Sequence, residues 1–197
     1  GEVGTWQVNE VFNRRAGVDF PNASILADVD NDGLDDWVIA AGSAPRPDGA
    51  IVWLKGSLDG DRLTFDEMRS IPLPEQRRWY RQIIAADLDG DEDLDLITTN
   101  HDSRGNPRVE WFENMGFEGT AEFTHHYVAD RGGAHLAVAD LDADGDLDIV
   151  LPQPFGGPSL IWLEQAAGVD GSWTERVIDD TTGRGFGTQV VDLDGDG

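Results

Sequence analysis

Short apolar runs alternate along the whole chain with clusters of glycine, proline, asparagine and aspartate, and no run keeps a helical period over a window of about 11 residues. Apolar segments lead into each acidic loop: ASILAD, QIIAAD, HLAVAD and TQVVD. Further apolar segments follow the first three loops directly: DWVIAAG, DLITTN and DIVLPQ. Such runs, bounded by turn residues, predict buried β-strands on both sides of each loop.

The acidic loops repeat at a regular interval. They begin at Asp28, Asp87, Asp140 and Asp192, which are 59, 53 and 52 residues apart. Two more segments keep the same phase, a strand that contains Trp53, Trp111 or Trp162 and an aromatic-led strand that begins near Phe65, Phe123 or Trp173. The N-terminal segment around Trp6 matches the aromatic-led strand. Four strands repeated about every 50 residues are typical of a β-propeller blade.

We therefore expect an all-β fold, a partial β-propeller of four-stranded antiparallel blades with about three complete blades plus flanking strands. The expected units are 1–12 as the outer strand of a preceding blade, 24–72, 82–130 and 134–180 as complete blades, and 187–197 as the start of a truncated blade. Closed propellers typically have about four to eight blades, so we expect a piece of a longer propeller. A β-sandwich is the alternative, but it does not require each unit to repeat its loop chemistry.

Composition narrows the functional classes. The chain has 39 acidic and 14 basic residues and a formal net charge of −25, which disfavours nucleic acid as a partner. Seven tryptophans and eight phenylalanines favour a folded protein over an acidic disordered one. There is no cysteine, so disulfides and thiolate metal sites are excluded. No apolar run is long enough for a membrane span.

The acidic loops predict cation sites. Numbered from its first aspartate, each complete loop has Asp at positions 1, 3, 5 and 9. Position 7 would add a backbone carbonyl, from Leu34, Asp93 or Asp146. The candidate ligands are Asp28, Asp30, Asp32, Leu34 and Asp36; Asp87, Asp89, Asp91, Asp93 and Asp95; and Asp140, Asp142, Asp144, Asp146 and Asp148. So many oxygens suit Ca²⁺, whereas Mg²⁺ takes fewer protein ligands in stricter geometry.

Two other interpretations of the loops are weaker. Carboxylates packed so closely repel one another without a cation, which argues against a simple solvated turn. An EF-hand needs flanking helices and a glutamate at position 12. Position 12 is instead Ile39, Thr98 or Leu151, within strand-like sequence.

The pattern Asp-x-Asp-x-Asp-Gly-x-x-Asp between two strands, once per blade, resembles the FG-GAP/VCBS repeats of integrin-α-type β-propellers. The strands WFEN and WLEQ are similar to the VCBS-like bacterial branch, and Phe-Gly precedes the last loop in GFGTQVVDLDGDG. The resemblance implies one Ca²⁺ per complete loop, about three in all, in a recognition or scaffolding module. It also implies an extracytoplasmic location, whether secreted, periplasmic or on the cell surface.

Two loops depart from the pattern. Position 6, where glycine permits a sharp turn at Gly33 and Gly145, is Glu92 in the second loop. If the backbone there needs a positive φ, Glu92 carries strain of about 1 kcal/mol, and we expect a weaker site. The last loop ends at position 6, so Asp192, Asp194 and Asp196 form an incomplete site.

Propeller topology places the other loops on the face opposite the aspartates, and these loops hold ten of the fourteen basic residues. The candidate ligand face comprises Arg15, Arg46, Arg78, Trp79, Tyr80, Arg81, His101, Arg104, Arg131, His135 and Arg184. Arginine beside aromatic rings suits an acidic glycan or an acidic protein segment. The alternative is that these arginines bridge blades through salt links.

Three functions remain open. The first is a calcium-binding module that recognises a protein or glycan, and we expect no enzymatic activity. The second is a carbon–oxygen lyase acting on carbohydrate, the catalytic propeller of a polysaccharide lyase or sugar dehydratase, with His101, His135 or Tyr80 as the base. The third is a structural spacer.

Overall fold

A computed structural model gives the structure of the chain. It describes residues 18, 20–43, 46–74, 78–102, 106–117, 119–132, 135–154, 156–166 and 172–193. The side chains of residues 46–48, 66 and 102 lie outside this description. The expected strand at 1–12 lies outside the described residues as well, and the segment expected at 187–197 is described only as far as residue 193.

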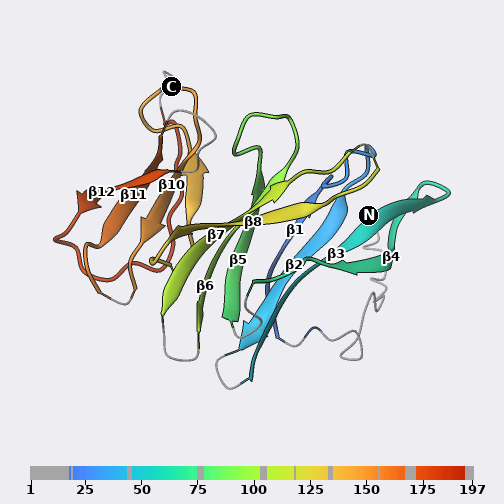
Figure 1. The fold of residues 1–197 in the computed structure, drawn as a ribbon, viewed down its shortest axis with the longest axis horizontal. Coiled ribbons are helices and arrows are strands. Elements are labelled where there is room, and N and C mark those ends of the chain that lie inside the picture. Colours follow the sequence, from blue (N-terminus) through green and yellow to red (C-terminus); the bar gives the residue numbers. More distant parts are fainter. Residues whose placement is uncertain are drawn as a thin grey trace, which may run out of the picture.

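The described residues form three four-stranded antiparallel sheets (Figure 1). The first sheet contains β1 (Pro21–Ala27), β2 (Asp36–Ser43), β3 (Arg46–Asp59) and β4 (Arg62–Ser70). The second contains β5 (Arg78–Ala86), β6 (Asp95–Asp102), β7 (Pro107–Asn114) and β8 (Phe123–Ala129). The third contains β9 (Ala137–Ala139), β10 (Asp148–Pro152), β11 (Leu160–Gln165) and β12 (Trp173–Asp179). In each sheet the strands are adjacent in chain order, so every sheet is a meander.

The three sheets share one register. In each sheet the last residue of the first strand pairs with the aspartate that begins the second: Ala27 with Asp36, Ala86 with Asp95, and Ala139 with Asp148. The acidic loops therefore span equivalent positions, and Figure 1 shows all three at the same edge of the assembly, at the top of the view. This confirms the sequence-based expectation of repeated units with the aspartates between the first and second strands.

The middle sheet is covered on both faces. On β6, Leu96 packs into a core shared with the first sheet, whereas the next residue, Ile97, packs into a core shared with the third. Phe112 and Trp111 on β7 divide in the same way. Alternate residues of a strand point to opposite faces, so a strand covered on both sides can bury consecutive apolar residues. This explains the adjacent apolar pairs on β6 and β7, although the same strands also bury polar residues, among them Thr98 and Glu110.

The all-β expectation is confirmed, and three such sheets are consistent with partial propeller blades. One boundary differs in a way that matters for the candidate ligand face. β5 begins at Arg78, whereas the second unit was expected to begin at residue 82. Arg78, Trp79, Tyr80 and Arg81 thus belong to a strand of the sheet, not to the connecting loop in which the sequence placed them.

Candidate metal centre

The aspartate at position 9 ties each loop to the third strand of its sheet. Asp36, Asp95 and Asp148 are at most 1% exposed. One carboxylate oxygen of each accepts a hydrogen bond from the backbone N–H at loop position 2, that of Val29 (3.2 Å), Leu88 (3.1 Å) or Leu141 (3.0 Å). The other oxygen accepts from the backbone N–H of Gly56 (2.7 Å), Asn114 (2.7 Å) or Gln165 (2.9 Å). The position 9 aspartate thus has a structural role, whatever the loop binds.

The aspartate at position 1 closes the turn. Asp28 accepts hydrogen bonds from the backbone N–H groups of Asp32 (3.1 Å) and Gly33 (2.8 Å). Asp140 likewise accepts from Gly145 at 3.1 Å. In the second loop the carboxylate of Asp87 accepts from the backbone N–H groups of Gly90, Asp91 and Glu92, at 2.8 to 3.1 Å. Aspartate favours such local bonds to its own backbone, which is why this residue type organises tight turns.

Carboxylate oxygens converge in all three loops. The oxygens of Asp28, Asp30 and Asp32 lie within 4.8 Å of one another, as do those of Asp87, Asp89 and Asp91. In the third loop the converging group is Asp140, Asp142 and Asp148. The structure thus brings together positions 1, 3 and 5 in two loops and positions 1, 3 and 9 in the third. Among the other predicted carboxylate ligands, Asp93, Asp144 and Asp146 lie in the same loops but outside these groups. The backbone carbonyl predicted as a ligand at Leu34 lies in the first of these loops.

The loops need left-handed backbone at two positions. Position 6 has φ of 89° at Gly33, 76° at Glu92 and 100° at Gly145. The positive φ at Glu92 is the condition under which we expected strain in the second loop. Position 4 also has positive φ, at Asn31 (55°), Gly90 (79°) and Ala143 (61°), which sequence reasoning missed. Asparagine and glycine at this position were the available signal, because both tolerate this conformation.

Burial and mutual repulsion disturb the titration of these carboxyl groups. Burial raises the pKa of Asp36 to about 6 and that of Asp95 to about 7. Burial, together with the charge of Asp91, raises the pKa of Asp89 to about 6. A raised pKa means that the ionised form is disfavoured in the folded state, and a nearby cation would reverse this.

The loops fit a hard cation by their donor chemistry. All converging ligand atoms are carboxylate oxygens, and no nitrogen or sulfur ligand is among them. Asp30 is 1% exposed, and its Oδ1 atom has no hydrogen-bond partner among the described residues. A buried acceptor without a donor is costly, and Lys55, which contacts the other oxygen of Asp30, supplies positive charge there. By their donor chemistry, the aspartate groups of the three loops could each hold a metal ion.

The candidate ligand face needs correction. Arg78, Tyr80 and His101 are 2%, 0% and 6% exposed, so they are core residues and not surface contacts. Arg78 donates from Nη1 to Asn100 Oδ1 and to the backbone oxygen of Asn106, both at 3.2 Å, and its Nε lies 4.0 Å from Glu110. These residues are buried because β5 and β6 pack between the two outer sheets.

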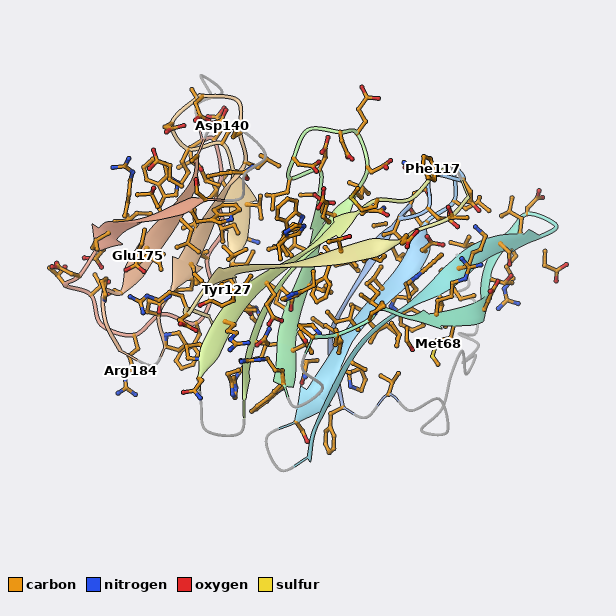
Figure 2. The ribbon with its side chains drawn as sticks, viewed as in Figure 1. Met68, Phe117, Tyr127, Asp140, Glu175 and Arg184 are labelled. Carbon is orange, nitrogen blue, oxygen red and sulfur yellow. The ribbon has the colours of Figure 1, made fainter. Side chains whose placement is uncertain are left out.

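The remaining candidates are more exposed, and some have partners. Arg131 pairs with Glu175 on β12 at 2.9 Å, which is a salt link between the second and third units. Trp79 is half-buried, packing against His101 and lying under the guanidinium of Arg81. Arg184 and His135 are exposed, and Figure 2 places Arg184 at the end of the third sheet away from Asp140. The side chain of Arg46 and all of Arg15 and Arg104 lie outside the described residues.

The last loop adds little to the geometry. Asp192 is described and exposed, whereas Asp194 and Asp196 lie outside the described residues. Among the described residues, no helix is long and apolar enough to cross a membrane.

Sequence reasoning missed two positions on the third strands. Lys55 contacts the aspartates of the first loop, while Glu113 and Glu164 occupy the same place near the second and third loops. One residue further on, Asn114 and Gln165 each hydrogen-bond to the loop of the preceding sheet. Aligning the third strands, WLKG with WFEN and WLEQ, would have marked both positions as different in the first unit.

Comparison with known proteins agrees with the geometry. The family model described as FG-GAP-like repeat matches twice, over residues 28–98 and 87–151, so each match begins at an aspartate loop and ends just beyond the next. No curated protein matches the chain. The two matches together cover more than half of the sequence and include all three complete loops. The chain belongs to the FG-GAP-like repeat family.

Proposed function

We propose that this chain is a calcium-binding β-propeller module that serves recognition of a protein or an acidic glycan. The observation that carries the calcium part is the convergence of three aspartate side chains in each of three equivalent loops. Oxygen-only ligands on a loop between strands suit Ca²⁺, which accepts six to eight oxygens in flexible geometry. The ion would join the first and second strands of a sheet.

The calcium would act through stability. An ion that binds only the folded state at about 100 times its dissociation constant adds about 2.7 kcal/mol per independent site. Extracellular modules bind calcium with dissociation constants of about 10⁻⁴ to 10⁻³ M, so a stabilising role is effective where calcium is abundant. We accordingly place the protein outside the cytoplasm, in a secreted, periplasmic or surface setting.

The positions of the candidate catalytic bases in the structure favour a binding function over catalysis. Tyr80 and His101 are buried in the core, where a sugar substrate would not reach them. His135 is exposed, and its backbone N–H donates to the backbone oxygen of Phe186. A recognition surface remains available at exposed cations such as Arg184.

Thermal unfolding with Ca²⁺, with Mg²⁺ and with EDTA tests the proposal. We expect Ca²⁺ to raise the midpoint and EDTA to abolish the gain. Asp91→Asn should reduce the calcium-induced shift, because it removes a converging carboxylate while Oδ1 can still accept the turn hydrogen bond from Asp93. The matched control is Asp180→Asn, an exposed aspartate outside the loops. A midpoint that is the same in Ca²⁺ and EDTA would refute calcium binding.

The recognition part needs its own measurement. We expect acidic glycans on an array to retain the protein in Ca²⁺ and to lose it in EDTA, and Arg184→Ala to weaken retention. Retention of neutral and acidic glycans alike would argue against an arginine-based surface. Turnover of an acidic glycan with release of an unsaturated product would favour the lyase alternative.

A further inference from the structure

The three third strands place one side chain each at the same point beside an aspartate loop. Trp53, Trp111 and Trp162 pair with Val38, Ile97 and Val150, each of which lies two residues after the position 9 aspartate. The residues two positions beyond these tryptophans are therefore equivalent. They are Lys55 in the first sheet, Glu113 in the second and Glu164 in the third.

Lys55 points into the first loop. Its Nζ contacts the carboxylate of Asp30, which is buried, and lies 2.6 Å from Asp32 Oδ2. The lysine side chain is itself only 24% exposed, so the ammonium is partly withdrawn from water together with its partners. An ammonium in this place supplies the positive charge that the buried Asp30 carboxylate requires.

Glu113 and Glu164 have the opposite effect on their loops. Glu113 adds negative charge beside Asp89, and Glu164 lies beside Asp142. Each glutamate thus brings a further carboxylate to the edge of a loop that already holds a converging triad. A cation in the second or third loop would meet a carboxylate that His126 or Arg176 offsets in part, whereas a cation in the first would face the ammonium of Lys55 itself.

The fourth strand shows a matching exchange of charge. The residue opposite Lys55 is Glu67, whereas Glu113 and Glu164 face Thr124 and Thr174. In the second and third sheets the basic residue opposite the tryptophan binds the third-strand glutamate, as His126 with Glu113 and Arg176 with Glu164. In the first sheet Arg69, opposite Trp53, binds Glu67 instead. In the first unit the third strand thus carries the cation and the fourth strand the glutamate. The third and fourth strands of this unit both differ from those of the other two units.

From this geometry we infer that Lys55 is a built-in counterion for the first aspartate loop, so that the chain binds divalent cations at the loops 87–95 and 140–148 but not at 28–36. The inference rests on the proposed calcium binding and sharpens it from three sites to two. The first unit would then keep its fold at any calcium concentration, whereas the other two would respond to calcium.

Counting bound ions tests the inference. Native mass spectrometry and calorimetric titration with Ca²⁺ should give two ions for the wild type and three for Lys55→Glu, which copies the glutamate of the other two units. Lys55→Met keeps the aliphatic length and removes the charge, so it should also admit a third ion. Arg69→Met removes a cation from the same sheet without touching the loop, and it should leave the count at two.

A second readout does not depend on calcium. In EDTA, Lys55→Met should unfold at a lower temperature than Arg69→Met, because it leaves Asp30 buried without a counterion. Three ions on the wild type would overturn the inference and leave the calcium proposal standing. No ion on any variant would refute the calcium proposal. In that case, equal stability of Lys55→Met and Arg69→Met in EDTA would overturn the counterion role too, and lower stability of Lys55→Met would uphold it.

Discussion

Asn114 holds the backbone of Val29, which lies 85 residues earlier in the chain and in the neighbouring sheet. The amide Nδ2 donates to the backbone oxygen of Val29 at 2.8 Å and to that of Leu94 at 3.3 Å. Gln165 repeats the link one unit later, from Nε2 to the backbone oxygen of Leu88 at 3.1 Å. In both cases the acceptor is position 2 of an aspartate loop, so the second and third sheets each stabilise the loop of the sheet before them.

Removing this link should weaken the contact between neighbouring sheets. We expect Asn114→Ala to lower the free energy of unfolding by about 1–3 kcal/mol, because it leaves a backbone acceptor without its donor. Urea denaturation in calcium-free buffer measures the effect. Thr124→Ala on the adjacent strand, whose side chain is exposed, is the control. A loss no larger than that of the control would show that the link contributes nothing.

The position 9 aspartates should be needed even without metal. Both oxygens of Asp95 accept backbone hydrogen bonds, so Asp95→Asn places an amide N–H against an N–H donor. We expect a loss of about 1–3 kcal/mol in EDTA. Asp91→Asn, in the exposed part of the same loop, should change stability in EDTA by less than about 0.5 kcal/mol. Equal losses for the two variants would contradict the structural role of position 9.

Glycine should stabilise the loops at Glu92 and Ala143. These residues have φ of 76° and 61°, a conformation that costs non-glycine residues about 1–2 kcal/mol. Glycine also loses more chain entropy on folding, so we expect a net gain of about 0.5–1 kcal/mol for each substitution. Thermal unfolding checks this.

Gly33→Ala provides the reverse comparison. A Cβ at Gly33 would meet no atom within 4 Å, so its effect reports backbone strain without a clash. We expect it to lower stability by about 1 kcal/mol. Stabilisation by this substitution would contradict the strain argument for all three positions.

The partly buried His125 should make stability depend on pH. Burial lowers the pKa of His125 from 6.5, although Glu110, 3.6 Å from its Nε2, acts in the opposite direction. The unfolded chain therefore binds the proton more readily than the folded one. The stability associated with neutral His125 is present above pH 6.5 and is lost as the pH falls through the lowered pKa.

His125→Gln tests this dependence. Other charged groups also face the ring, among them Arg108 and His126, so the useful quantity is the difference between the wild type and the variant at each pH. We expect the wild type to lose stability relative to His125→Gln as the pH falls below 6.5. A difference that stays constant over this range would exclude His125 as the titrating group.

Much of the architecture could be predicted from the sequence because the same pattern recurs in three units. The aspartates at fixed positions, the tryptophan strand and the aromatic-led strand recur in phase, so each unit supports the interpretation of the next. Glu92 could be singled out as strained because the neighbouring units have glycine there. From a single unit, the aspartate loop could have been either an ordinary acidic turn or a metal site. The repetition of its pattern favoured a metal site.

The candidate ligand face was harder to predict from the sequence. The beginning of β5 lies within the sequence RRWYRQ, which has the polarity of a loop. Arg78 can enter the core only because Asn100 and Glu110 on β6 and β7 receive its guanidinium. Those partners lie more than twenty residues away, so local sequence did not reveal the burial of Arg78. The same holds for Lys55, whose contact with Asp30 spans 25 residues.

The link from Asn114 to Val29 gives the array a direction. In both hydrogen bonds the donor side chain belongs to a later unit and the acceptor loop to the unit before it. A ribosome releases the first loop well before the strand that secures it, and the same delay separates the second loop from Gln165. In a chain made from its N-terminus, the loops at 28–36 and 87–95 thus receive these hydrogen bonds only once the third strand of the following sheet is present.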